Sequence, residues 1–421
     1  MKNNPSAMMG LYGSNELFCH TVRDIYRMKE DIDGEALTKA VNTALKRYPY
    51  FSVKLVKHGD EVIHTVVPND RPVVVADRTE PFTLYSKETN QHFFAVLYHE
   101  KEIYLDISHA FVDGTAIYEF AKTLLYYYIK EKNGMPLPAG VIRTLDTPVT
   151  DEEITDPYLN IPPLTEKPVG GRPKPVPAFR LSESGMVTDK NYAVFKLSVG
   201  EDVFMKYSRR NDGSPATMTA AFLARTIFRL HDNPGRPVRI NLSLNQRPVL
   251  GTPKAHHSVV GNVVLEYPER VKNWDMHKLG TISRSMVMIQ SDPANVLSGI
   301  HGMKKIIDGL YHIEDEGALK KACNRLFASA GTYTTAVVSY VGKSDFGVLD
   351  DYIESHYTYL DPYYCDISIE IAAVNGYFVY TFMQAFSDDV YVKALADEFR
   401  KEGIEAELGK AEPLIFPRTS I

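Results

Sequence analysis

Cysteine and tryptophan are scarce in this sequence, with three cysteines and one tryptophan in 421 residues. The cysteines, Cys19, Cys323 and Cys365, are far apart and odd in number. They fit neither a disulfide framework nor a zinc site with paired ligands. We therefore expect reduced thiols, as in a cytoplasmic protein, and no metal site.

Long apolar runs and clusters of positive charge are also lacking. No apolar segment reaches the ~20 residues that span a bilayer, and residues 1–22 lack the basic and apolar segments of a signal peptide. The 47 Lys and Arg residues are outnumbered by 53 Asp and Glu, for a net charge of -6. This balance argues against nucleic-acid binding, which usually requires a strongly basic face. At 44% hydrophobic residues the chain can bury a large core, and its length favours two domains.

The segment with the clearest chemical meaning is a histidine between a strand and a helix. Residues 102–107 alternate apolar and polar, which is typical of a half-buried strand. From Thr115 to about Lys132 the apolar residues follow helical spacing. His109, Asp113 and Gly114 therefore lie in the turn, where a rigid scaffold can direct polar side chains into a cleft. Gly114 and the preceding strand interrupt the helix that a His–Asp metal site would need.

The rest of the chain alternates helices with short strands, which indicates an α/β fold. Asp33 is expected to cap a helix that Pro49 stops. Residues 157–177 contain many prolines and two glycines, which excludes the interior of a helix or sheet and predicts a crossover between domains. Further elements are expected at 192–197, 202–209, 215–230, 238–244, 275–289, 314–328, 336–341, 367–373, 378–384 and 388–401.

Four ordered segments extend the pattern around His109. A helix followed by Arg47, one residue and Pro49 precedes it, and three motifs follow it: Asn241–Pro248 with Arg247, Ser258–Asn262, and Ser339–Gly342. With the His-x3-Asp-Gly motif, they resemble the chloramphenicol acetyltransferase and condensation-domain superfamily. That superfamily includes freestanding alcohol acetyltransferases.

The resemblance implies two similar α/β sandwich domains with a tunnel between them. We expect an N-terminal domain at 1–160, the Pro-rich crossover at 161–180 and a C-terminal domain at 181–421. The implied activity is transfer of an acyl group from a coenzyme A thioester to a hydroxyl acceptor, with His109 as general base and no permanently bound cofactor. Asp113 would pair with Arg247 to hold the turn, while Gly114 would let the backbone bend into the helix.

Further site residues and alternatives follow from the same resemblance. Ser339, Asn262 and Ser108 are candidates for stabilising the oxyanion or lining the tunnel. Ser339 could also bond only to backbone, and Asn262 could only secure a turn at Gly261. Ser108 stands where many peptide-synthetase condensation domains have a second histidine, which favours the alcohol acetyltransferase branch.

The donor and the acceptor stay open at this point. The acyl donor could instead be the phosphopantetheine arm of an acyl carrier protein, and the acceptor could be a small or lipid-like molecule. A catalytically idle member that uses the cleft for binding is the third alternative. His256 and His257 are expected in a surface loop, and the other histidines, His20 among them, have no partner at a useful spacing.

Overall fold

The hairpin that leads to His109 forms where the alternating residues predict it. The computed structural model describes residues 3–15, 18–134, 137–187, 189–232, 235–343, 345–362 and 364–421. Strands β6 (Phe94–His99) and β7 (Glu102–Ser108) pair antiparallel. The buried apolar residues of β7, Ile103, Leu105 and Ile107, belong to a core cluster shared with the helix that follows. His109 is therefore placed at the end of a strand that packing holds rigidly.

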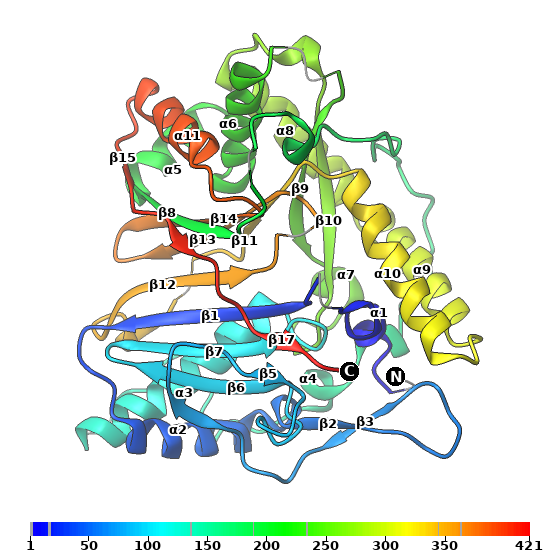
Figure 1. The fold of residues 1–421 in the computed structure, drawn as a ribbon, viewed down its shortest axis with the longest axis vertical. Coiled ribbons are helices and arrows are strands. Elements are labelled where there is room, and N and C mark those ends of the chain that lie inside the picture. Colours follow the sequence, from blue (N-terminus) through cyan, green and yellow to red (C-terminus); the bar gives the residue numbers. More distant parts are fainter. Residues whose placement is uncertain are drawn as a thin grey trace.

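Two helices cover one face of this first sheet: α2 (Gly34–Arg47) and α3 (Gly114–Asn133) (Figure 1). The predicted N-cap of α2 is confirmed, since the Asp33 side chain accepts hydrogen bonds from the backbone N–H groups of Glu35 and Ala36 at 2.9 and 3.0 Å. Gly134 ends α3 in a left-handed conformation. Both boundaries are thus set by local chemistry, and α3 starts directly after the turn that contains His109.

A strand from the second half of the chain completes the first sheet. The strand order is β12 (Ile353–Leu360), β1 (Thr21–Met28), β7, β6 and β4 (Val75–Asp77). Strand β12 pairs antiparallel with β1 along its length. The division into 1–160 and 181–421 stays a prediction, and residues 353–360 cross it.

The second sheet carries the other wall of the site. Its order is β10 (Val260–Tyr267), β9 (Val238–Asn245), β11 (Ala336–Tyr340), β13 (Ile367–Val374), β14 (Tyr377–Gln384), β8 (Ala193–Gly200) and β15 (Ala406–Leu408). Strand β11 runs parallel to both of its neighbours. Helices α5 (Glu201–Arg210), α6 (Pro215–Leu230), α8 (Met276–Gln290) and α11 (Val390–Lys401) share a second core cluster with this sheet and lie above it in Figure 1.

Two helices of the second half pack against the core of the first half. Helices α9 (Pro293–Leu310) and α10 (Glu316–Thr332) contribute buried residues to the first core cluster, including Ile300 and Leu319. Across the described ranges, no helix is both long and apolar enough to cross a bilayer. The remaining elements are α1 (Met8–Gly13), β2 (Val53–Val56), β3 (Thr65–Pro68), β5 (Thr83–Leu84), α4 (Asp151–Ile154), α7 (Arg247–Leu250), β16 (Glu412–Pro413) and β17 (Arg418–Thr419).

The predicted Pro-rich crossover contains no helix or strand between residues 161 and 180, all of which the structure describes. It runs along the side of the molecule that carries α9 and α10 (Figure 1). Its backbone is fixed at Gly170, whose N–H and carbonyl both bond to the Asn295 side chain at 3.0 and 2.8 Å. The crossover is thus a defined segment that links the two halves.

Candidate active site

The His109 ring is oriented by its own turn. Its Nδ1 lies 2.6 Å from the carbonyl oxygen of Val112. A carbonyl oxygen only accepts, so Nδ1 carries the hydrogen and donates it. In the neutral imidazole Nε2 is then unprotonated and able to take up a proton.

A second histidine, His20, packs against the His109 ring. The rings of His20 and His109 stack with centroids 5.1 Å apart and an interplanar angle of 21°. The backbone N–H of His109 also donates to the carbonyl of His20 at 2.8 Å. Burial, reinforced by the neighbouring His109, lowers the pKa of His20 to about 3. His20 therefore stays neutral at physiological pH and presents an uncharged ring to His109.

Asp113 pairs with Arg247, as the resemblance implies. Nη1 and Nη2 of Arg247 donate to the two carboxylate oxygens of Asp113, both at 2.8 Å. Both residues are 1% exposed. Asp113 also caps α3 by accepting from the backbone N–H of Ala116 at 3.3 Å. The carboxylate thus ties the start of α3 to the second half of the chain.

The segment around His257 closes the same junction through backbone bonds. The N–H of Ser258 donates to the carbonyl of Phe111 at 3.1 Å, and the N–H of Val259 donates to Asp113 at 3.2 Å. His256 and His257, predicted in a surface loop, are each 1% exposed. That prediction is wrong because the loop packs between the two halves.

Gly114 lies where the two halves approach closely. Its φ is not positive, so the turn does not use the left-handed conformation that glycine allows, and that Gly114 lets the backbone bend tightly stays a prediction. A Cβ at this position would lie 2.9 Å from Cγ2 of Val341, which follows β11. Glycine therefore lets the first turn of α3 contact the second sheet.

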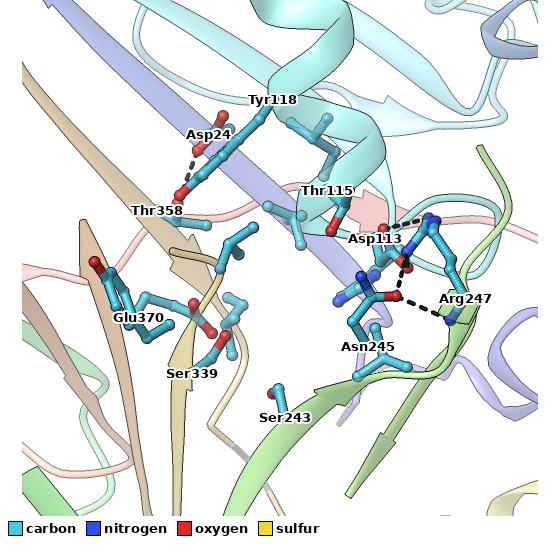
Figure 2. Close-up of a pocket in the computed structure, with 18 residues that line it drawn as sticks. Asp24, Asp113, Thr115, Tyr118, Ser243, Asn245, Arg247, Ser339, Thr358 and Glu370 are labelled. Atoms are coloured by element: carbon cyan, nitrogen blue, oxygen red, sulfur yellow. Dashed lines mark hydrogen bonds and ion pairs between the residues drawn. The ribbon is translucent and has the colours of Figure 1, made fainter. Parts of the chain in front are cut away.

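His109, Asp113 and Gly114 line a cavity of about 140 Å³ between the two sheets. The walls come from β1, α3, β9, β10, β11, β12 and β13. Figure 2 shows Asp113, Asn245 and Arg247 on one side and Ser339 with Glu370 on the other. The cavity lies where the interdomain tunnel is predicted, and that the tunnel opens at two mouths stays a prediction.

Two carboxylates on the cavity wall have different surroundings. Asp24 accepts hydrogen bonds from Tyr26, His356 and Thr358 at 2.6, 2.7 and 2.7 Å. Burial and the nearby Asp24 raise the pKa of Glu370 to about 7, and the neighbouring Ser339 hydroxyl partly opposes this rise. The charge of Glu370 therefore changes near neutral pH.

The three remaining predicted site residues lie in different places in the structure. Ser339 lines the cavity with His109. Asn262 is exposed within β10, not in a turn, and lines a different cavity with Arg172 and Gln246. Ser108 is 1% exposed and is not among the residues that line the His109 cavity.

Sequence spacing missed His20, Asp24, Asn245 and Glu370. His20 and Asp24 reach the site through the pairing of β1 with β7, which no local motif signals. Asn245 precedes Arg247 and accepts from its backbone N–H at 3.1 Å. Glu370 alone left a signal, since it is the one charged residue in the apolar strand β13.

Comparisons with known proteins rest on structure. No protein-family model matches the sequence. No curated protein matches it. The structure is similar to polyketide synthase associated protein 5 from Mycobacterium tuberculosis, with 14% identity, a TM-score of 0.59 and coverage of 93% of this chain and 94% of that one.

Two further solved structures cover nearly the whole chain. F. graminearum TRI101, complexed with coenzyme A and deoxynivalenol, has 11% identity and a TM-score of 0.59 over 95% of this chain and 98% of its own. The EpoB cyclization-docking bidomain from Sorangium cellulosum has 11% identity and a TM-score of 0.56 over 95% and 83%. These likenesses confirm the predicted fold, that of the chloramphenicol acetyltransferase and condensation-domain-like proteins.

Proposed function

We propose that this chain is an acyltransferase that moves an acyl group from a coenzyme A thioester to a hydroxyl acceptor, with His109 as general base. The observation that carries the proposal is the bond from His109 Nδ1 to the Val112 carbonyl, in a residue that lines the cavity between the two sheets. That bond leaves Nε2 as the basic nitrogen.

The reaction requires little more than a well-placed base, because a thioester carbonyl is already activated. As the acceptor oxygen attacks the carbonyl carbon, Nε2 of His109 takes the hydroxyl proton. The tetrahedral intermediate then collapses, the carbon–sulfur bond breaks, and the imidazolium returns the proton to the leaving thiolate. Ester and free thiol are the products, and His109 is neutral again.

Asp113, Arg247 and Gly114 act on His109 through position. The carboxylate of Asp113 is occupied by Arg247 and by the backbone of Ala116, so it holds the turn and takes no proton. Ser339, on the wall opposite Asp113 (Figure 2), is the hydroxyl we assign to the oxyanion. Ser339 and Glu370 line the same cavity as His109.

The donor and the acceptor can be narrowed to classes. TRI101 was solved with coenzyme A, which supports a coenzyme A thioester as co-substrate; the EpoB bidomain leaves a carrier-protein-borne phosphopantetheine as the alternative. The cavity of about 140 Å³ is smaller than the ~300–1,000 Å³ of sites for drug-sized ligands, which favours a small alcohol. Ser108 in place of a second histidine supports the alcohol acetyltransferase branch.

A direct test screens acyl-coenzyme A thioesters of increasing chain length against small alcohols and amines, with free-thiol release as readout. We expect thiol release that depends on the acceptor and an ester product identified by mass spectrometry. Release without an acceptor would indicate hydrolysis. If no acyl-coenzyme A releases thiol with any acceptor but an acyl group is transferred from an acyl carrier protein, the donor is the carrier-protein alternative. If neither donor is used, the proposal is contradicted.

A further inference from the structure

Glu370 is an unusual residue for the wall of this cavity. It sits in the middle of β13, whose neighbours in the strand, Ile369 and Ile371, are buried apolar residues. Its side chain lines the cavity that His109 also lines. Figure 2 shows it on the side of the cavity opposite Asp113 and Arg247. A carboxylate in such a place costs free energy unless a donor or a cation compensates it.

Among the described residues, no cation pairs with this carboxylate. The neighbouring Ser339 hydroxyl is the group that favours its charged form. The cationic side chain on the same cavity, Arg247, is fully engaged by Asp113 across the site. Among the ion pairs formed by the described residues, none includes Glu370. Among the described residues, Glu370 therefore has no positively charged partner on this wall.

Asp24, the neighbouring carboxylate, does not have this property. Tyr26 donates to one of its oxygens, and His356 and Thr358 donate to the other. Its position is 1% exposed, and its bonds hold β1 and β12 together. Asp24 adds negative potential to the cavity without offering a comparable binding group.

From this juxtaposition we infer that the acceptor carries a protonated amine that binds Glu370 while its hydroxyl lies at His109. The inference rests on the proposed function and narrows the acceptor to amino alcohols. The ammonium group would donate to the Glu370 carboxylate, and a charge-assisted hydrogen bond of this kind fixes orientation as well as adding affinity. The hydroxyl at the other end of a short carbon chain would then lie toward the base.

The protonation behaviour of Glu370 supports this assignment. Burial and Asp24 raise its pKa to about 7, and a bound cation would favour the charged form. Cation binding would then release a proton, so affinity decreases as the pH falls below about 7. The titratable and charged groups that line the same cavity are Asp24, His109, Asp113, Tyr118, Arg247 and Tyr340.

The test compares three acceptors of equal length with the same acyl-coenzyme A: 3-amino-1-propanol, 1,3-propanediol and 1-butanol. In the wild type we expect the amino alcohol to have the highest kcat/KM. Glu370→Gln should lower kcat/KM for the amino alcohol by about 10- to 100-fold, mainly through KM, and leave the other two acceptors unchanged. Glu407→Gln, an exposed glutamate of β15, is the matched control and should behave as wild type.

Two kinetic outcomes would overturn the inference. If Glu370→Gln slows the diol as much as the amino alcohol, the residue binds a neutral donor. If the wild type has no higher kcat/KM for the amino alcohol than for the other two acceptors, Glu370 does not bind a cationic group of the acceptor. If no acceptor is turned over, the proposed function fails separately, and calorimetric titration of 3-amino-1-propanol decides the cation site: binding lost in Glu370→Gln supports it, and no binding to the wild type overturns it.

Discussion

His109 is fixed by contacts that each restrict a different degree of freedom. The backbone bond to the His20 carbonyl holds its main chain, the Val112 carbonyl selects its tautomer, and the His20 ring supports its face. In the proposed reaction the stack requires a flat, uncharged partner, because a charged one would repel the imidazolium that His109 would form. In the proposed reaction His20 is therefore a positioning residue for His109.

The first prediction concerns the shape of His20. His20→Ala removes the ring that His109 rests on and should lower kcat about tenfold through misplacement of Nε2, with a smaller change in KM. His20→Phe keeps a flat ring and should retain most of the activity. Steady-state kinetics of the two variants decide the point, and equal losses in both would show that the ring does not position His109.

The second prediction concerns how the free energy of unfolding depends on pH, because folded His20 does not bind a proton near neutral pH. Folded His20 has a pKa of about 3, whereas an unfolded histidine has one near ~6.5. Between these values the unfolded chain binds a proton that the folded chain does not, so the free energy of unfolding falls as the pH falls. Lowering the pH from 7 to 5 should cost the wild type about 2 kcal/mol more than His20→Phe.

Urea unfolding followed by the fluorescence of Trp274, the one tryptophan of the sequence, measures both variants. The comparison of wild type with His20→Phe at each pH cancels the titration of other groups. Parallel pH dependences would contradict a His20 that stays neutral in the folded chain.

At the scale of elements, the turn between β7 and α3 is held by a buried ion pair. Removing one partner leaves the other charged, buried and unpaired. Arg247→Met should therefore reduce the free energy of unfolding by about 3–5 kcal/mol. Arg247→Lys should recover only part of it, because lysine cannot match both oxygens of Asp113.

Chemical denaturation measures this effect, with Arg270→Met as control because Arg270 is exposed. The double variant Asp113→Asn, Arg247→Met should be more stable than Arg247→Met alone. A single variant as stable as the control would show that the pair does not hold the junction.

The contact between Gly114 and Val341 yields the fourth prediction. Gly114→Ala places a methyl group 2.9 Å from Cγ2 of Val341, so the Val341 side chain or the turn that precedes α3 must shift. We expect roughly a tenfold loss of kcat/KM from the displaced turn. Val341→Ala removes the obstructing methyl and should restore activity in the double variant, and a loss that persists there would refute the steric explanation.

Elements with strong local patterns could be predicted from the sequence, and those defined by distant contacts could not. The alternation of apolar and polar residues predicted β7. Pro215 and the helical spacing of the apolar residues after it predicted α6 at 215–230. Helix α9 was missed because Gly299, Gly302 and Gly309 obscure its pattern. Strand β12 was missed because its place is set by a distant contact: it joins a sheet whose other strands lie within residues 21–108.

The same limit applies to the site. His109, Asp113 and Arg247 were predictable because the resemblance supplied their roles, and the structure brings the last two into contact. His20 and Glu370 were not, since one reaches the site through strand pairing and the other through the facing wall of the cavity. Spacing along a chain carries no information about either contact.

At the scale of the whole molecule, the two halves are coupled by a shared strand. Strand β12 belongs to the second half of the chain but pairs with β1 in the first sheet. Helices α9 and α10 also bury residues in the first core. Trp274 packs at the edge of the second core, while far-UV circular dichroism reports both halves. We predict coincident urea transitions by the two signals, because neither half keeps its sheet or core when the other unfolds. A Trp274 transition clearly separated from the dichroism would contradict this coupling.

The central claim is that His109 removes the acceptor proton, and one rate measures it most directly. It is kcat/KM for acceptor-dependent thiol release by His109→Ala, compared with wild type and with His58→Ala, an exposed histidine in the β2–β3 connection. Loss of a general base predicts a decrease of about 10²- to 10⁴-fold in His109→Ala, with unchanged Trp274 fluorescence and wild-type activity in the control. Equal rates for all three proteins would contradict the account.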